Sequence, residues 1–262
     1  MAVAATKPKL AKARGAKAPL SLLASPEKLF LAAFTTIAVV TAFFHEPWAD
    51  EAQAWLIARD LSVSGILHQM GYEGSPPLWH LLLWLLTRLH MPYALLGIVS
   101  VALVASGMYI WLRWSPLPAF VRYVVPFAFY YQYQYAVVAR SYALATLLAF
   151  AAAALWRAKP VQVIPLAAVL ALLAQTNMHG FMIAMGIACA FTWECFKELR
   201  KGRLPGAQMV AIAIGGAMVI ASAVVARILA SPYADCSFKA AVQLRKGTRL
   251  ESISSAFDGL FG

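Results

Sequence analysis

Long stretches without a charged side chain dominate this sequence and predict helices that cross a membrane. No Lys, Arg, Asp or Glu occurs in residues 29–44, 141–156, 160–193 or 204–226. A helix needs about 20 apolar residues to span a bilayer, and fewer when its flanking side chains reach the interface, so 160–193 is long enough for two. Only 13% of all residues are charged, whereas a soluble domain carries roughly 25%.

The apolar pattern predicts an all-α, polytopic membrane protein with about eight transmembrane helices. The expected segments are 29–44, 77–89, 93–112, 123–138, 141–156, one on each side of 176–181, and 209–228. If the loops 45–76 and 130–142 face the same side, an even number of crossings must separate them, but three apolar segments lie between. Either the short segment 77–89 does not cross fully or the boundaries differ, and the sequence leaves this open.

The formal net charge of +11 comes from basic residues that gather in the N-terminal tail and in two short loops, 157–159 and 197–203. The loop 45–76 instead holds five of the eleven acids. Because positively charged loops remain in the cytoplasm, we expect a cytoplasmic N-terminus and an extracytoplasmic loop 45–76. A nucleic-acid-binding protein would need its basic residues on one continuous water-facing surface. The expected partners of these charges are therefore anionic membrane lipids.

This pattern divides the chain into three regions. Residues 1–28 are rich in Ala, Lys and Pro and are predicted to be a disordered basic cytoplasmic tail. Residues 29–229 are predicted to form the transmembrane domain, including the extracytoplasmic acidic loop with its interfacial helices. Residues 230–262 are predicted to be a polar extracytoplasmic segment at which the chain is truncated.

Two adjacent acids, Asp50 and Glu51, follow the first apolar run. Pro47 just before them indicates a helix start, and negative charge is favourable in a first helical turn. Apolar residues on one face of that helix, with Trp48 and Trp55 as anchors, predict that it lies along the membrane interface. The two carboxylates either cap and solubilise this helix or act chemically, since a carboxylate can deprotonate a hydroxyl or an amine.

Another acid, Glu73, lies in a turn of Gly, Ser and Pro residues immediately before the apolar segment 77–89. A carboxylate at this point is either a surface charge or part of the lining of a cavity at the membrane interface. His80 follows one turn into the expected helix, where it is either an interfacial packing residue or a ligand-binding residue.

Arg140 and His179 interrupt apolar sequence at predicted helix ends. An arginine at a membrane face is either a functional residue or one whose side chain reaches the interface. Its planar guanidinium suits a phosphate or diphosphate, because it can form two parallel hydrogen bonds. The tyrosines around it, including Tyr142, are either part of such a site or an aromatic belt. His179 either lines a polar cavity or belongs to a short turn.

The three cysteines and the histidines show neither a disulfide framework nor a metal-binding spacing. The sequence therefore demands no cofactor and leaves the metal unknown. Carboxylates beside a lipid phosphate could hold a divalent cation.

Three motifs in the expected order resemble those of the GT-C membrane glycosyltransferases. After the first apolar helix come "ADEAQAW", then "YEGSPPLWHLLLWLL", and later "ARSYAL". The similarity is to bacterial relatives of the dolichyl-phosphate-mannose protein mannosyltransferases and of the lipid A aminoarabinose transferase. It is strongest over residues 29–90, fainter to about 181 and absent beyond.

The resemblance implies an inverting transfer of a sugar from a polyprenyl-phosphate donor to a lipid, glycan or protein acceptor. The reaction would take place at the extracytoplasmic face of the bacterial cytoplasmic membrane. The implied catalytic residues are Asp50 as general base, Glu51 in its support, and Glu73. The implied residues for donor-phosphate or substrate binding are Arg140, Tyr142, His179 and His80.

Three other functions remain open on the sequence. A transporter or flippase for a lipid-linked or anionic substrate would use the same acids and Arg140 for binding alone. Transporters often contain repeats and broken helices near the midplane, and neither is visible in the sequence. An inactive fragment of the transferase is a second alternative, because members of this family usually contain several hundred residues. A non-catalytic membrane scaffold is a third.

Overall fold

The computed structural model describes residues 25–158 and 160–233, and within these ranges all regular structure is helical. This confirms the predicted all-α class. The helices in chain order are α1 (Pro26–Phe43), α2 (Ala49–Asp60), α3 (Val63–Glu73), α4 (Leu78–Arg88), η2 (Tyr93–Leu95), α5 (Leu96–Trp114), α6 (Ala119–Val124), η3 (Val125–Phe127), η4 (Tyr130–Tyr135), α7 (Ser141–Arg157), α8 (Val163–Ala174), α9 (Met178–Arg200) and α10 (Gly206–Leu229).

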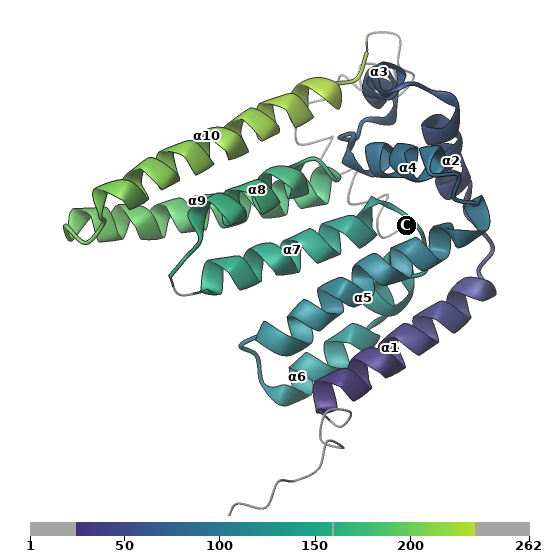
Figure 1. The fold of residues 1–262 in the computed structure, drawn as a ribbon, viewed down its shortest axis with the longest axis horizontal. Coiled ribbons are helices and arrows are strands. Elements are labelled where there is room, and N and C mark those ends of the chain that lie inside the picture. Colours follow the sequence, from purple (N-terminus) through teal and green to yellow (C-terminus); the bar gives the residue numbers. More distant parts are fainter. Residues whose placement is uncertain (1–24, 159, 234–262) are drawn as a thin grey trace, which may run out of the picture.

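The longer helices lie side by side in one bundle (Figure 1). α1 packs on α5, α5 on α7, and α7 on α8, while α9 and α10 both pack on α8. The short helices α2, α3 and α4 gather at one end of this bundle (Figure 1). The buried core is made largely of Ala, Val and Leu side chains, with Phe34 and Met108 at the α1–α5 contact.

Four helical segments among the described residues are long and apolar enough to cross a membrane. They are Pro26–Phe43, Tyr93–Trp114, Met178–Arg200 and Gly206–Leu229. Ser141–Arg157 and Val163–Ala174 are shorter apolar helices. These helices indicate an integral membrane protein, although they do not confirm the predicted count of about eight spans.

The short helix α4 bears on how many membrane crossings separate the loops 45–76 and 130–142, which the sequence leaves open. Its 11 residues extend only about 16 Å, whereas the hydrocarbon core of a bilayer is about 30 Å thick. It packs mainly on α2, through Ala54, Ala58 and Leu83. α4 therefore packs with α2 and α3 and is too short to span the hydrocarbon core on its own.

The expected single span over 123–138 is broken in the structure. α6 ends at Val124, η3 contains Pro126, and residues 130–135 form a π-helical turn. Proline lacks the backbone N–H that continues a helix, and its ring clashes with the preceding turn. Short π-helical turns occur frequently at functional sites. This irregular segment leads directly to Arg140.

The acidic loop 45–76 contains the helices α2 and α3, and helices were expected in this loop. Ser62 caps the start of α3 by accepting a hydrogen bond from the Gly65 N–H, at 3.2 Å. Gly74 ends α3 with a φ of 62°, a left-handed conformation that glycine adopts without steric cost. The predicted tail 1–28 and the segment 230–262 lie mostly outside the described residues.

Candidate functional site

A polar cavity of about 360 Å³ opens where the short helices meet the bundle. We use the name polar cavity for the space lined by Asp50, Gln53, Ala54, Glu73, Gly74, Ser75, Pro76, Trp79, His80, Arg140, Ser141, Tyr142, Thr176, Asn177 and Met178. Four parts of the chain supply these residues: the start of α2, the segment from the end of α3 to the start of α4, the start of α7 with the residue before it, and the α8–α9 turn with the first residue of α9. Five of the seven predicted site residues line it, namely Asp50, Glu73, His80, Arg140 and Tyr142.

The polar cavity contains an ion pair between Asp50 and Arg140. The Arg140 Nη2 atom lies 3.0 Å from the Asp50 Oδ2 atom, and the Asp50 side chain is 55% exposed. The Arg140 guanidinium also lies over the Tyr142 ring, 5.6 Å from its centroid. Because exposed ion pairs contribute little to stability, a ligand phosphate can replace Asp50 as the partner of Arg140 at small cost.

Glu73 connects α2 and α3 at the edge of the same cavity. Its Oε1 atom accepts hydrogen bonds from Gln53 Nε2 at 3.0 Å and from Gln69 Nε2 at 3.3 Å. Both donors are neutral amides, so neither supplies a positive charge to balance the carboxylate. The polar cavity therefore presents two carboxylates against one guanidinium.

His80 forms part of the cavity wall and is buried, with a relative exposure of 6%. Its Nδ1 atom is buried and has no hydrogen-bond partner among the described residues. Burial lowers the pKa of the His80 imidazole, and the negative charge of Glu73 opposes this effect. His80 thus contributes to the cavity wall a buried imidazole with one ring nitrogen unpartnered within the described ranges.

The structure separates Glu51 from the cavity, although it neighbours Asp50 in the sequence. The Glu51 side chain is 3% exposed. It accepts three hydrogen bonds: from Ala139 N–H at 2.6 Å, from Trp48 N–H at 2.7 Å, and from His45 Nε2 at 2.9 Å. A carboxylate with three donors in a buried setting holds parts of the protein together, whereas Asp50 faces the open cavity.

His179 also lies outside the lining of the polar cavity. Its ring is adjacent to that of Tyr142, with centroids 5.7 Å apart, and Tyr142 in turn stacks on Tyr135 at 5.5 Å. His179 therefore borders the cavity residue Tyr142 without lining the cavity itself.

Several residues of the cavity were not predicted from the sequence. Asn177 caps α9 by accepting from Gly180 N–H at 2.8 Å, and it donates to Ser141 Oγ at 3.0 Å. The pattern Asn-x-x-Gly at the start of a helix is a recognisable capping signal, but nothing local shows that Ser141 is its partner. Leu78 N–H donates to the Gln175 carbonyl at 3.0 Å, which holds α4 against the α8–α9 turn.

No group of three or more His, Cys, Asp or Glu side chains in the described part of the chain is placed to hold a metal ion. Of the two cavity carboxylates, Asp50 pairs with a guanidinium and Glu73 accepts from two amides.

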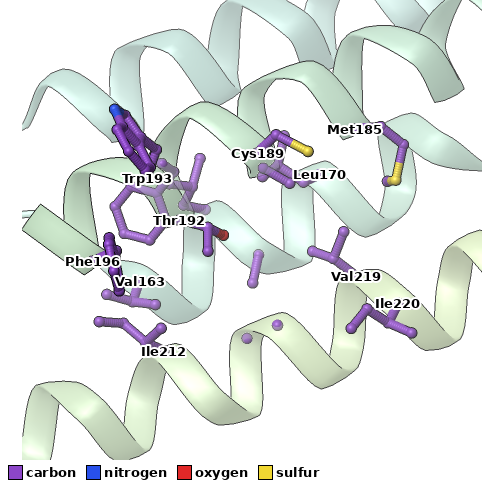
Figure 2. Close-up of a pocket in the computed structure, with 16 residues that line it drawn as sticks. Val163, Leu170, Met185, Cys189, Thr192, Trp193, Phe196, Ile212, Val219 and Ile220 are labelled. Carbon is purple, nitrogen blue, oxygen red and sulfur yellow. The ribbon is translucent and has the colours of Figure 1, made fainter.

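A second, larger space lies between α8, α9 and α10 and is almost wholly apolar. This apolar groove, of about 630 Å³, is lined by residues of all three helices. Trp193, Phe196 and Ile212 lie toward one end, and Met185 and Ile220 toward the other (Figure 2). Both α9 and α10 pack on α8 but touch each other little, so α8 forms the floor of the groove.

Comparisons of the chain with protein-family models, with curated proteins and with solved structures found no match. A function is therefore inferred from the residues and their geometry.

Proposed function

We propose that this protein transfers a sugar from a polyprenyl-phosphate donor to an acceptor hydroxyl or amine at the extracytoplasmic face of the membrane. The observation that carries this proposal is the placement of the Asp50 carboxylate and the Arg140 guanidinium side by side, 3.0 Å apart, in a cavity at one end of a membrane bundle. One group can accept a proton and the other can hold a phosphate.

The reaction requires one bond to form as another breaks. The acceptor oxygen or nitrogen attacks the anomeric carbon, and the proton of the acceptor passes to Asp50. The bond between the anomeric carbon and the phosphate oxygen breaks, and the polyprenyl phosphate leaves with the electron pair. Arg140 stabilises the negative charge that grows on this leaving group. Attack from the face opposite the phosphate inverts the anomeric configuration.

The distribution of charge supports an extracytoplasmic position for the polar cavity. The connection between α9 and α10, at the opposite end of the bundle (Figure 1), carries Lys201 and Arg203 and follows Lys197 and Arg200. By the positive-inside rule that end belongs in the cytoplasm. The end with the polar cavity then faces outward, in a bacterial cytoplasmic membrane with the N-terminus inside.

The apolar groove supports a donor with a long hydrocarbon tail. Met178 lines the polar cavity and Met185 lines the groove, both on α9. Seven residues of helix correspond to about 10 Å. A lipid whose phosphate lies at Arg140 therefore has an uncharged surface for its tail within a short distance, inside the membrane.

Transfer by the purified chain in lipid vesicles supplied with polyprenyl-phosphate sugars tests the proposal. Asp50→Asn should reduce transfer by about 10²- to 10⁴-fold, since it removes the general base. The matched control is Asp60→Asn, at an exposed carboxylate on the same helix that pairs with Arg59. Wild-type vesicles that move the lipid-linked sugar across the bilayer without transferring it would instead establish a flippase.

A further inference from the structure

A buried polar cluster beside the cavity is left unused by the proposed chemistry. It consists of His45, Glu51 and Tyr133, from the loop after α1, the first turn of α2, and η4. The side chains of His45 and Glu51 are 6% and 3% exposed. A buried carboxylate is costly unless donors surround it, so this cluster needs a structural or functional reason.

The buried cluster and the ion pair of the cavity join the same two short pieces of chain, residues 50–51 and 139–140. Asp50 pairs with the Arg140 side chain, while the next residue, Glu51, accepts from the N–H of Ala139, the residue before Arg140. Two consecutive carboxylates thus hold two consecutive residues of the η4–α7 connection. Where Glu51 places the Ala139 backbone determines where the Arg140 side chain begins.

His45 completes this arrangement from the other side. Its Nε2 atom lies 2.9 Å from Glu51 Oε2 and its Nδ1 atom lies 3.2 Å from the Tyr133 hydroxyl. An ionised carboxylate only accepts hydrogen bonds, so His45 Nε2 is the donor to Glu51. The imidazole therefore links the loop after α1 to η4, the irregular segment that leads to Arg140.

We propose that His45 and Glu51 are positioning residues, which hold Arg140 opposite Asp50 without touching the substrate. Their effect on transfer rests on the proposed function, whereas their hold on the Ala139 backbone can be measured without any substrate. Misplacing a binding group by about 1 Å can cost a reaction on the order of 10²-fold. The cluster is thus expected to matter for rate although it lies outside the cavity.

Three substitutions of His45 separate the roles of its two nitrogens. His45→Gln places an amide N–H where Nε2 lies, His45→Asn places an amide group, which can accept or donate, where Nδ1 lies, and His45→Phe removes both polar groups. We expect His45→Phe to reduce kcat/KM for a polyprenyl-phosphate sugar by about 10- to 100-fold. His45→Gln should recover most of this loss and His45→Asn little of it. Equal recovery by both amides, or no loss in His45→Phe, would overturn the proposal.

A double-mutant cycle with Arg140→Met tests whether His45 acts through Arg140. If it does, His45→Phe costs little further activity once Arg140 is absent, because residues in one network are non-additive. If the two losses multiply, His45 acts by another route and the inference is wrong.

Amide hydrogen exchange of the protein in lipid nanodiscs measures the hold on Ala139 without substrate. We expect exchange at Ala139 to accelerate about tenfold or more in His45→Phe and Glu51→Gln, with α8 and α10 unchanged. The amide in Glu51→Gln cannot accept from every donor that faces Glu51. Unchanged exchange at Ala139 in both variants would overturn the positioning role. Accelerated exchange in a protein that transfers no sugar would uphold the structural link and reject the proposed transfer.

Discussion

The polar cavity lies at the turn that joins α8 to α9, and the apolar groove lies along these two helices and α10, yet the two spaces differ in almost every property. The cavity is the smaller, at about 360 Å³ against about 630 Å³ for the groove. It contains Asp50, Glu73 and Arg140, whereas none of the described residues that line the groove is charged. Size alone would therefore direct attention to the space that has no charged side chain in its described lining.

The difference follows from where each space lies along the bundle. The cavity forms at helix ends, where the α8–α9 turn contributes Thr176 and Asn177 and where α2 and α4 pack against the bundle. The groove lies along the helices themselves, where charged groups are costly in a membrane. One molecule with a charged head and a hydrocarbon tail matches both spaces, and variants in each space test the two halves separately.

After Asp50→Asn, Arg140→Met should have the largest effect. Losing the guanidinium should reduce kcat/KM for the lipid-linked sugar on the order of 10²-fold, because removing one preorganised donor to a developing charge costs about that much. Arg140→Lys keeps the charge but not the planar fork, so it should recover only part of the loss. Transfer by reconstituted protein over a range of donor concentrations measures both variants.

Arg88→Met is the matched control for this change. Arg88 lies at the end of α4 and donates to the carbonyls of Arg59 and Leu61, away from the cavity lining. An equal loss in Arg88→Met and Arg140→Met would mean that the interface layer as a whole, and not the phosphate contact, determines the rate.

Part of the candidate site could be predicted from the sequence. Five predicted residues line one cavity in the structure: Asp50, Glu73, His80, Arg140 and Tyr142. Each residue lies at the end of an apolar run or in a turn beside one, and helix ends at the same membrane face must be neighbours in a bundle. The all-α class and the helices of the loop 45–76 follow from the same periodicity. The sequence does not determine whether 77–89 forms a full membrane span or a short helix such as α4, because this segment is as apolar as a span.

Other features depend on contacts that no local pattern contains. Glu51 is buried because it meets Ala139, 88 residues later in the chain, and His45 meets Tyr133 across the same interval. Two adjacent carboxylates thus have different surroundings: the Asp50 side chain is exposed to the cavity, and the Glu51 side chain is buried. The π-helical turn at 130–135 escaped prediction for a similar reason: an aromatic apolar run has the composition of a continuous span.

Gly216→Leu tests the groove and should have a smaller effect. A Cβ at Gly216 meets nothing within 4 Å, whereas one at Gly215 would lie 3.0 Å from Ala167 Cβ, so only Gly216 can accept a larger side chain without disturbing α8. Filling the groove should raise KM about three- to tenfold for donors with a long tail and leave short-tail donors unchanged. The effect is modest because lipid surrounds the tail in either state.

Ala213→Leu is the control for this experiment. Ala213 is exposed on the same helix and lies outside the groove lining. If it shifts KM as Gly216→Leu does, or if the shift does not depend on tail length, the groove does not hold the tail.

The buried His80 predicts how stability changes with pH. Burial lowers the pKa of the folded-state imidazole, while the unfolded chain titrates near its ordinary pKa of about 6.5. As the pH falls below about 6.5 toward the lowered value, the unfolded state binds more protons than the folded state, so stability decreases. The melting temperature in detergent should therefore fall between about pH 8 and about pH 5.5, and His80→Phe should reduce that decrease. His68→Gln, at an exposed histidine of α3, should leave it as in the wild type.

Ser222→Ala should have the smallest effect, because it removes a polar contact from the apolar half of the molecule. Ser222 Oγ donates to the Ala171 carbonyl at 2.7 Å and accepts from Gln175 Nε2 at 3.0 Å, which ties α10 to α8 near the groove. Hydrogen bonds between membrane helices average about 0.6 kcal/mol, so we expect the melting temperature to fall by about 1–4 °C. Ser106→Ala removes only a bond within α5, to the Ala102 carbonyl, and should leave the melting temperature unchanged. Equal shifts in the two variants would show that the tie between α8 and α10 adds nothing, and that apolar packing alone holds the groove together.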